Sequence, residues 1–141
     1  MQRLKTIEDI TWYDDGKSTS AQSLGAALHS FAEPIIVICG GSDKGDSFDH
    51  LADLFKQHAV HGVFLGQTAP QFAKIFDAIG LSYTIAHSMQ ETVSLAWLAA
   101  KEYSAKTILF SPGCASFDMF KNYEDRAHQY IEAVQGIGNK E

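Results

Sequence analysis

Short apolar runs alternate with helical patterns along this chain. Five runs rich in apolar and β-branched residues are interpreted as strands, at 10–13, 35–39, 62–65, 82–85 and 107–110. The run at 35–39 is apolar throughout, which is typical of a central strand covered on both faces. Between and after the runs, apolar residues recur at helical spacing in five segments, at 19–31, 48–58, 69–79, 90–103 and 117–134.

Sustained alternation of this kind predicts an α/β fold. We expect a three-layer, Rossmann-like domain with a mostly parallel sheet of about five or six strands flanked by helices, because parallel strands need helical crossovers. In such sheets ligands bind beyond the carboxyl ends of the strands, close to helix N-termini. The residues that directly follow each strand are therefore the ones to search for function.

Composition narrows the class of protein. A length of 141 residues, with 45% hydrophobic and 20% charged residues, predicts a single globular domain over residues 1–141. A net charge of −6 argues against binding to nucleic acid or to an anionic membrane surface. We see no apolar run long enough for a bilayer and no secretory signal, so we expect a cytoplasmic, monomeric protein with reduced thiols at Cys39 and Cys114.

The first polar segment that follows a predicted strand is DDGKSTS, at 14–20. It combines two carboxylates, a glycine, Lys17 and three hydroxyl groups at a junction between a strand and a helix. A helix N-terminus favours anions, and Lys17 would add a full positive charge. The alternative is that one hydroxyl residue at 18–20 only caps the helix while Asp15 orders the turn.

The second segment is GGSDKGD, at 40–46. Its paired glycines would allow the backbone to approach a ligand closely, and in a parallel sheet Lys44 would lie in the same layer as Lys17. Two glycines followed by polar residues are also a common turn, so this segment is weak evidence by itself.

The third segment runs from 111 to 126, after the last predicted strand. Ser116 and the neighbouring N–H groups could hold a carboxylate at the start of a helix. Three charged residues read equally well as ion pairs on a helix face: Asp118, Glu124 and Arg126. Three aromatic residues at helical spacing favour simple core packing: Phe117, Phe120 and Tyr123.

The sequence has no motif typical of P-loop nucleotide binding, of a serine hydrolase or of a metal site. There is no Walker A sequence, no nucleophile elbow, and no metal-ligand spacing among the six histidines, so we expect no metal site. Two lysines and several hydroxyl groups at one sheet edge predict a site for a small polyanion. A dicarboxylate and a phosphate would both fit this site.

Together, the three segments resemble the C-terminal domain of the D-glutamate-adding members of the Mur ligase family, which assemble peptidoglycan precursors. DDGKSTS resembles the family's (N/D)DSKATN, and GGSDKG resembles GGxDKG. The third segment is similar to SPACASFDMFKNYEDRG, a long and irregular motif. The chain departs from these motifs at five positions without losing a charged side chain: Gly16 for Ser, Ser18 for Ala, Ser20 for Asn, Gly113 for Ala and Ala127 for Gly.

The resemblance implies a reaction and a division of labour. ATP activates the alanine carboxylate of UDP-N-acetylmuramoyl-L-alanine as an acyl phosphate, and the amine of D-glutamate attacks it, releasing ADP and phosphate. The D-glutamate-binding residues would be Thr19, Lys44, Ser116, Phe117 and Tyr123. Those that face the nucleotide would be Asp15 and Lys17.

The same resemblance places ATP and Mg²⁺ mainly in a central ATPase domain and the UDP group in an N-terminal domain. We expect both of these domains to be absent from this chain, which would then be inactive alone. Two alternatives stay open, namely a folylpolyglutamate synthetase-type ligase domain and a non-catalytic, stand-alone α/β binding module. The motif at 111–126 and the lack of a DGAHNP-like segment argue against the first alternative.

Overall fold

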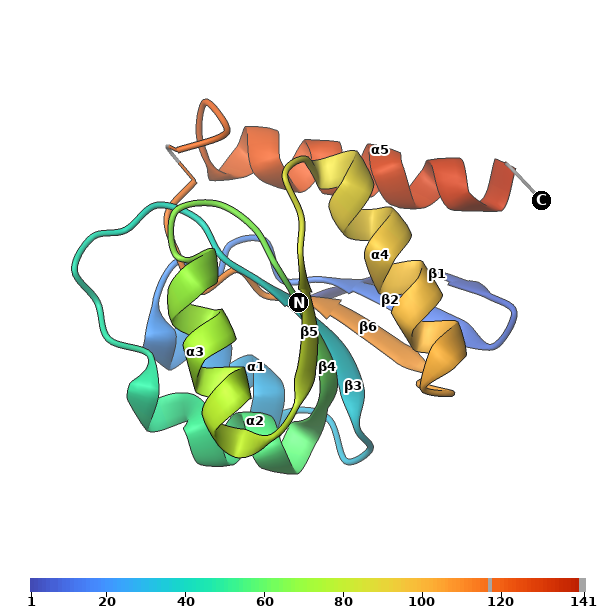
Figure 1. Ribbon diagram of the computed structural model, residues 1–141. Helices are drawn as coiled ribbons and strands as arrows, with labels where there is room; N and C mark the ends of the chain where they lie inside the picture. Colours follow the sequence, from blue (N-terminus) through green and yellow to red (C-terminus); the bar gives the residue numbers. More distant parts are fainter. Residues whose placement is uncertain (117, 140–141) are drawn as a thin grey trace.

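The computed structural model describes residues 1–116 and 118–139, and these form a sheet with helices on both faces (Figure 1). The strands are β1 (Gln2–Ile7), β2 (Ile10–Asp14), β3 (Ile35–Cys39), β4 (Ala59–Phe64), β5 (Ser82–Ile85) and β6 (Thr107–Phe110). The helices are α1 (Ala21–His29), the 3₁₀ helix η1 (Asp49–Leu51), α2 (Ala52–His58), α3 (Ala69–Ile79), α4 (Met89–Glu102) and α5 (Tyr123–Asn139).

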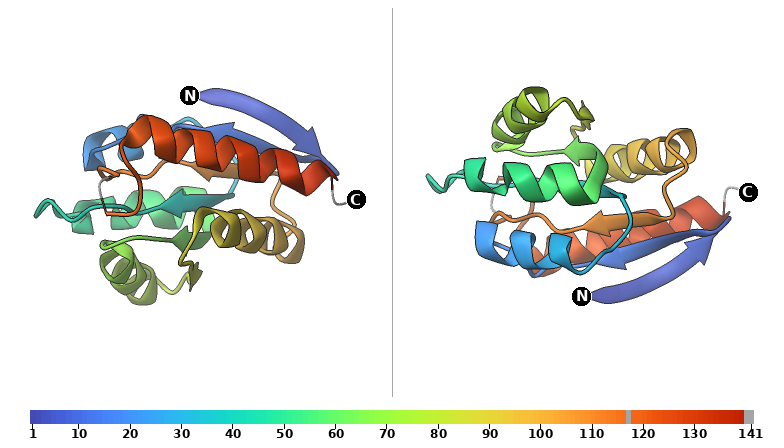
Figure 2. Two further views of the ribbon diagram at one scale, coloured as in Figure 1. Left: turned by 90° about the horizontal axis from the view of Figure 1, so that it is seen from above. Right: turned by 90° about the horizontal axis from the view of Figure 1, so that it is seen from below.

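The sheet confirms the predicted α/β architecture. Its strand order is β1-β2-β6-β3-β4-β5, and every pairing is parallel except that of β1 with β2. One core lies between the sheet and α4 and α5, and a second lies between the sheet and α1, α2 and α3. Figure 2 shows α5 foremost from above and α1 and α2 foremost from below. The fold is therefore a three-layer, Rossmann-like sandwich.

Strand β3 is apolar at every position because both of its faces are covered. Ile36 and Ile38 face the core under α4 and α5, whereas Val37 and Cys39 face the other core. Because side chains alternate between the two faces of a strand, a strand covered on both faces must be apolar at every position. All five of its residues are buried, as the sequence predicted.

Strand β1 was not predicted from the sequence. It is polar and mostly exposed, and it forms an antiparallel hairpin with β2 through Glu8 and Asp9, which both have positive φ values of 50° and 70°. Its order comes from backbone pairing at the sheet edge, and the charged side chains of Arg3 and Lys5 are typical of edge strands. A pattern based on burial does not detect such a strand.

Helix α5 begins at Tyr123, six residues later than predicted. The Asn122 side chain accepts the N–H of Asp125 at 2.8 Å, and the Asp125 carboxylate accepts the N–H of Lys121 at 3.1 Å. The first of these bonds caps the helix at its start, and the second holds the residue that precedes the cap. The expected helical spacing of Phe120 and Tyr123 is wrong, because residues 118–122 are not helical and Tyr123 is 41% exposed. Phe120 nevertheless packs against the core under α4 and α5, as expected, and Phe117 lies outside the described residues.

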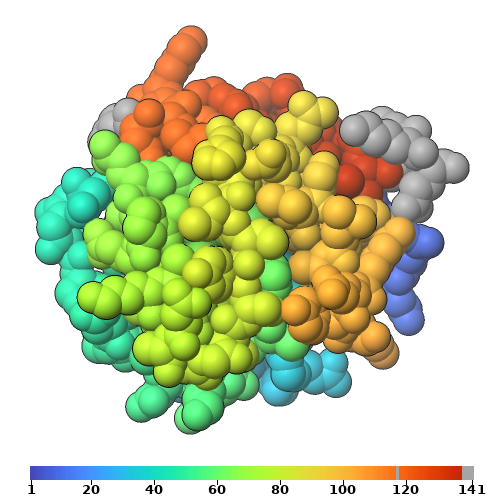
Figure 3. Space-filling model, in the orientation of Figure 1, coloured from blue at the N-terminus to red at the C-terminus, as the bar shows by residue number. Residues whose placement is uncertain are grey.

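Cys39 and Cys114 are both buried free thiols. Over residues 1–116 and 118–139, no helix combines the length and the apolar character that crossing a bilayer demands. In the space-filling view, α3, β5 and α4 form a continuous surface toward the viewer (Figure 3).

Candidate functional site

Backbone hydrogen bonds join the three polar segments at the carboxyl edge of the sheet. We call them the first loop (residues 15–20), the second loop (40–46) and the third loop (111–122). The N–H of Gly113 donates to Ser18 O at 3.1 Å, which joins the third loop to the first. The N–H of Ser42 donates to Ala115 O at 2.7 Å, which joins the third loop to the second. The predicted meeting of the three segments at one edge is therefore confirmed.

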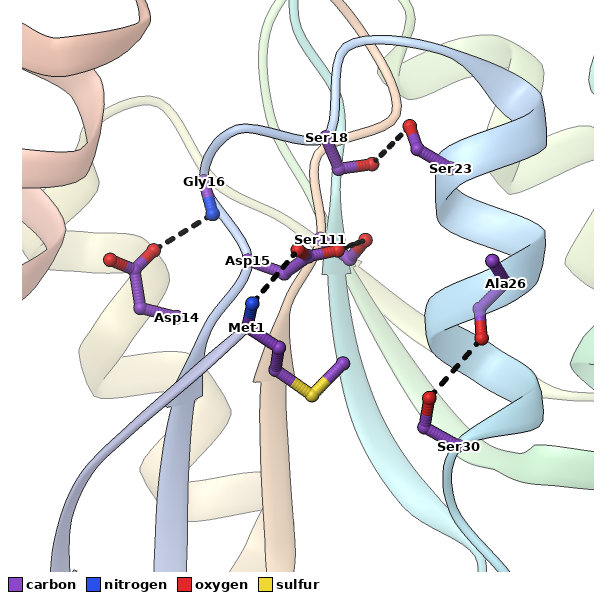
Figure 4. Close-up of polar contacts among 9 residues, drawn as sticks. All are labelled: Met1, Asp14, Asp15, Gly16, Ser18, Ser23, Ala26, Ser30 and Ser111. Carbon is purple, nitrogen blue, oxygen red and sulfur yellow. Dashed lines mark hydrogen bonds and ion pairs between the residues drawn. The ribbon is translucent and has the colours of Figure 1, made fainter.

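The first loop holds two carboxylates in different ways (Figure 4). Asp14 accepts the N–H of Gly16 at 2.8 Å, and Asp15 accepts the hydroxyl of Ser111 at 2.9 Å. Burial raises the pKa of Asp14, and the bond from Gly16 only partly counteracts this. Lys17 follows Gly16 and is exposed to solvent. The loop thus fixes its carboxylates and leaves a free-standing cation at the surface.

Helix α1 has a dedicated cap next to this loop. Ser20 is the N-cap: it accepts the N–H of Ser23 at 3.2 Å, and Ser23 accepts the N–H of Ser20 at 3.3 Å. The hydroxyl of Ser18 lies 2.9 Å from that of Ser23 (Figure 4). The capping alternative is therefore correct for Ser20. Thr19, which is partly exposed, is not the cap.

The second loop presents Lys44 on a tight turn. Asp43 accepts the N–H of Gly45 at 2.9 Å, and Lys44 between them is exposed. The second glycine of the pair at the start of this loop makes room for the third loop. A Cβ on Gly41 would lie 2.2 Å from Ala115 O, so the space that a side chain would need is filled by the third loop. The missing side chain therefore allows the second and third loops to come into contact.

The third loop is anchored by Arg126, whose side chain is fully buried. Its Nη1 donates to Cys114 O at 2.7 Å and its Nη2 donates to Gly16 O at 3.3 Å. Among the described residues its Nε has no hydrogen-bond partner. Burial lowers the pKa of Arg126 to about 10, so the group stays charged at neutral pH. The interpretation of Arg126 as an exposed ion-pair residue is wrong, because it joins the first and third loops from inside.

Sequence reasoning missed Arg126 although a signal was present. Its position shares one helical face with three buried apolar residues: Tyr130, Val134 and Ile137. A charged residue on the buried stripe of a helix is rarely a surface residue. Asp118 is also misassigned, because it precedes α5 and accepts hydrogen bonds from the second loop and from the segment after β4. Nothing in the local pattern marked that segment.

The structure brings several of the predicted site residues together. Asp15, Lys17 and Tyr123 line one surface depression of about 390 Å³ between the first loop and the start of α5. Thr19, Lys44 and Ser116 lie on the three bonded loops, and Ser116 is only 1% exposed. Phe117 lies outside the described residues. In the part of the chain that the structure describes, no three His, Cys, Asp or Glu side chains are arranged to hold a metal ion.

These features define a Rossmann-like α/β domain whose bonded loops present lysines and hydroxyl groups at the carboxyl edge of a parallel sheet. No protein-family profile matches the chain. It is 37% identical to part of a UDP-N-acetylmuramoylalanine–D-glutamate ligase of a Polaromonas species. The alignment covers 100% of this chain and 24% of that ligase. The ligase of the same name from Bacillus cytotoxicus is 37% identical, in an alignment that covers 97% of this chain and 30% of the ligase. The one from a Geobacter species is 38% identical, in an alignment that covers 96% of this chain and 29% of the ligase.

The chain is homologous to the C-terminal domain of the UDP-N-acetylmuramoylalanine–D-glutamate ligases. This agrees with the resemblance carried by the three loop motifs. The chain spans less than a third of the length of the relatives described above.

Proposed function

We propose that this chain is the D-glutamate-binding C-terminal domain of a cytoplasmic, ATP-dependent ligase that adds D-glutamate to UDP-N-acetylmuramoyl-L-alanine. One observation carries the proposal: three loops that resemble the motifs of these ligases are bonded together at the ligand-binding edge of the sheet. The names of the related ligases support the same conclusion.

The site chemistry suits a small dicarboxylate. In the proposal, the exposed ammonium group of Lys44 forms a charge-assisted hydrogen bond with one carboxylate of D-glutamate. The hydroxyl groups of Thr19 and Tyr123 donate further hydrogen bonds to the two carboxylates, whereas the role of Ser116, which is buried in this structure, rests on the resemblance. The contribution of the Phe117 backbone rests on the resemblance alone. These contacts engage only the carboxylates, so the amine of D-glutamate, after losing a proton to solvent, is free to attack the acyl phosphate and displace phosphate.

The first loop would serve the nucleotide side of the reaction. The Ser111 hydroxyl orients the Asp15 carboxylate, and the exposed Lys17 ammonium group can reach a terminal phosphate across a domain interface. The proposal assigns ATP, Mg²⁺ and the UDP substrate mainly to central and N-terminal domains of the ligase. This chain then binds and orients D-glutamate and closes over the ATP site, and it does not catalyse ligation alone.

The two alternatives differ in what they predict. The names of the relatives favour a D-glutamate-adding ligase over a folylpolyglutamate synthetase-type domain. A stand-alone binding module would share the α/β fold, but it would not require a preference for D-glutamate.

An amide NMR titration of the 141-residue chain tests the proposal. D-glutamate is added, with L-glutamate and ADP titrated in parallel. We expect shifts specific to D-glutamate at residues 17–19, 44 and 116, because these lie on the bonded loops. Equal shifts with both enantiomers, or none at millimolar D-glutamate, would contradict a preformed D-glutamate site on this chain.

A further inference from the structure

The short segment between β4 and α3 supports the second loop from behind. The N–H of Asp43 donates to the side-chain carbonyl of Gln67 at 3.0 Å. The side chain of Gln71 donates to the Asp43 carboxylate at 3.3 Å, and that carboxylate also accepts the N–H of Gly45. The turn that presents Lys44 is therefore held at its first residue by two side chains from another part of the chain, one from this segment and one from α3.

Gln67 is itself fixed by Asp118. The Asp118 carboxylate accepts the backbone N–H of Gln67 at 2.9 Å and lies 3.4 Å from the hydroxyl of Ser42. The N–H of Asp118 donates to the same hydroxyl at 2.9 Å. One carboxylate in the third loop thus contacts both the second loop and the segment that braces it.

The packing around this carboxylate is close. A Cβ on Gly66 would lie 2.3 Å from Asp118 Oδ2 and 2.9 Å from Gly41 Cα, and Gly66 has a positive φ of 77°. Only glycine combines this backbone conformation with room for the carboxylate. Thr68 adds two bonds on the same side: it donates its N–H to Gly41 O at 3.1 Å and accepts the N–H of Gly41 at 3.1 Å.

We propose that Gln67 and Asp118 are positioning residues for Lys44. A hydrogen-bonded series runs from Asp118 through Gln67 to Asp43 and holds the Lys44 turn at a set distance from Ser116. The inference rests on the proposed function, in which Lys44 and Ser116 bind the same D-glutamate. A lysine side chain is long and flexible, so a fixed turn reduces the entropy lost when it binds a carboxylate.

The pair of residues is tested on the 141-residue chain by amide hydrogen exchange and by D-glutamate titration. Gln67→Met keeps the side-chain length but removes the acceptor for the Asp43 N–H. We expect exchange at Asp43 to accelerate and the Kd for D-glutamate to rise by about three- to tenfold, the effect of one lost hydrogen bond. Gln67→Glu retains an acceptor and should restore slow exchange. Gln57→Met, on the exposed surface of α2, is the matched control.

Asp118 provides a second test, because a positioning role and a purely electrostatic role predict opposite changes in the affinity for D-glutamate. Asp118→Ala removes both acceptors and should weaken D-glutamate binding. If the carboxylate acted only through its charge, its removal would strengthen binding of a dianion. Asp118→Asn retains one acceptor for the Gln67 N–H and should bind D-glutamate better than Asp118→Ala does.

The outcomes separate the two proposals. If the unmodified chain binds D-glutamate and Gln67→Met has the same Kd, the positioning role is wrong and the proposed function stands. If the unmodified chain shows no D-glutamate binding, the proposed function fails and the positioning role fails with it. Equal melting temperatures for Gln67→Met and Gln57→Met would exclude a loss of folding as the cause of weaker binding.

Discussion

Gly16 and Ala127 share a space that holds one methyl group. A Cβ on Gly16 would lie 3.0 Å from the Cβ of Ala127 and 2.9 Å from the carboxylate of Asp14. The related ligase motifs have Ser and Gly at these two positions, whereas this chain has Gly and Ala. The two differences from the motifs that the chain resembles are complementary in volume, because this chain carries a methyl group on α5 and none at the facing position of the first loop.

This relationship predicts a double-mutant result. Gly16→Ser alone should destabilise the chain by about 1–3 kcal/mol, because it overpacks a close contact. Ala127→Gly alone should cost about 1 kcal/mol from helix propensity. Together, the two substitutions should cost less than the sum of the single ones, as measured by urea unfolding. Strict additivity would show that the two positions do not compete for space.

The two carbonyl contacts of Arg126 lead to a second prediction. Arg126→Lys should lower the free energy of unfolding by about 1.5–3 kcal/mol, because one ammonium group cannot reproduce both directed bonds to Cys114 O and Gly16 O. It should also weaken D-glutamate binding, since the first and third loops lose their shared anchor. Arg3→Lys, on the exposed edge strand, is the matched control. Equal stability of the two variants would contradict the anchoring role.

The partly buried carboxyl group of Asp14 should make the free energy of unfolding depend on pH. Burial raises the pKa of Asp14 above its ordinary value of 3.8, so the folded state binds this proton more tightly than the unfolded state does. The stability that this group contributes is full below pH 3.8 and is lost as the pH rises through the raised value. Asp14→Asn keeps an acceptor for the Gly16 N–H and has no carboxyl group to ionise.

Urea unfolding of both proteins between low and neutral pH measures the effect. The stability of Asp14→Asn relative to the unmodified chain should rise as the pH increases. The difference between the two proteins isolates Asp14 from the other titrating groups, which are common to both. A difference that stays constant with pH would show that the Asp14 carboxyl group is not perturbed.

Lys44 is the principal test of the dicarboxylate site. Lys44→Ala should raise the Kd for D-glutamate by about ten- to a hundredfold, since one charge-assisted contact contributes about 1.5–3 kcal/mol. Lys56→Ala removes an exposed lysine from α2 and should leave the Kd unchanged. In a ligase that carries this domain, Lys44→Ala should raise the KM for D-glutamate more than that for ATP. Equal effects on both substrates would contradict the assigned role.

Local sequence signals succeeded where burial follows a regular period. The apolar run at 35–39 predicted a central strand, and the helical spacing of Phe48, Leu51, Leu54 and Phe55 predicted a face toward the core, on which all but the partly exposed Leu54 are buried. They failed where order comes from partners distant in sequence. Strand β1 depends on β2 for its hydrogen bonds, and His61, which lies outside the strand predicted at 62–65, is buried on β4 beside Ser82.

The sequence by itself determined the α/β class, the three loops at the carboxyl edge and the resemblance to a ligase family, because periodic burial and contiguous motifs are local properties. Only the tertiary structure decided what holds those loops in place. Arg126 lies 110 residues from Gly16, and Asp118 lies 51 residues from Gln67. Contacts across such separations depend on how the strands are ordered in the sheet, and no local pattern along the chain records that order.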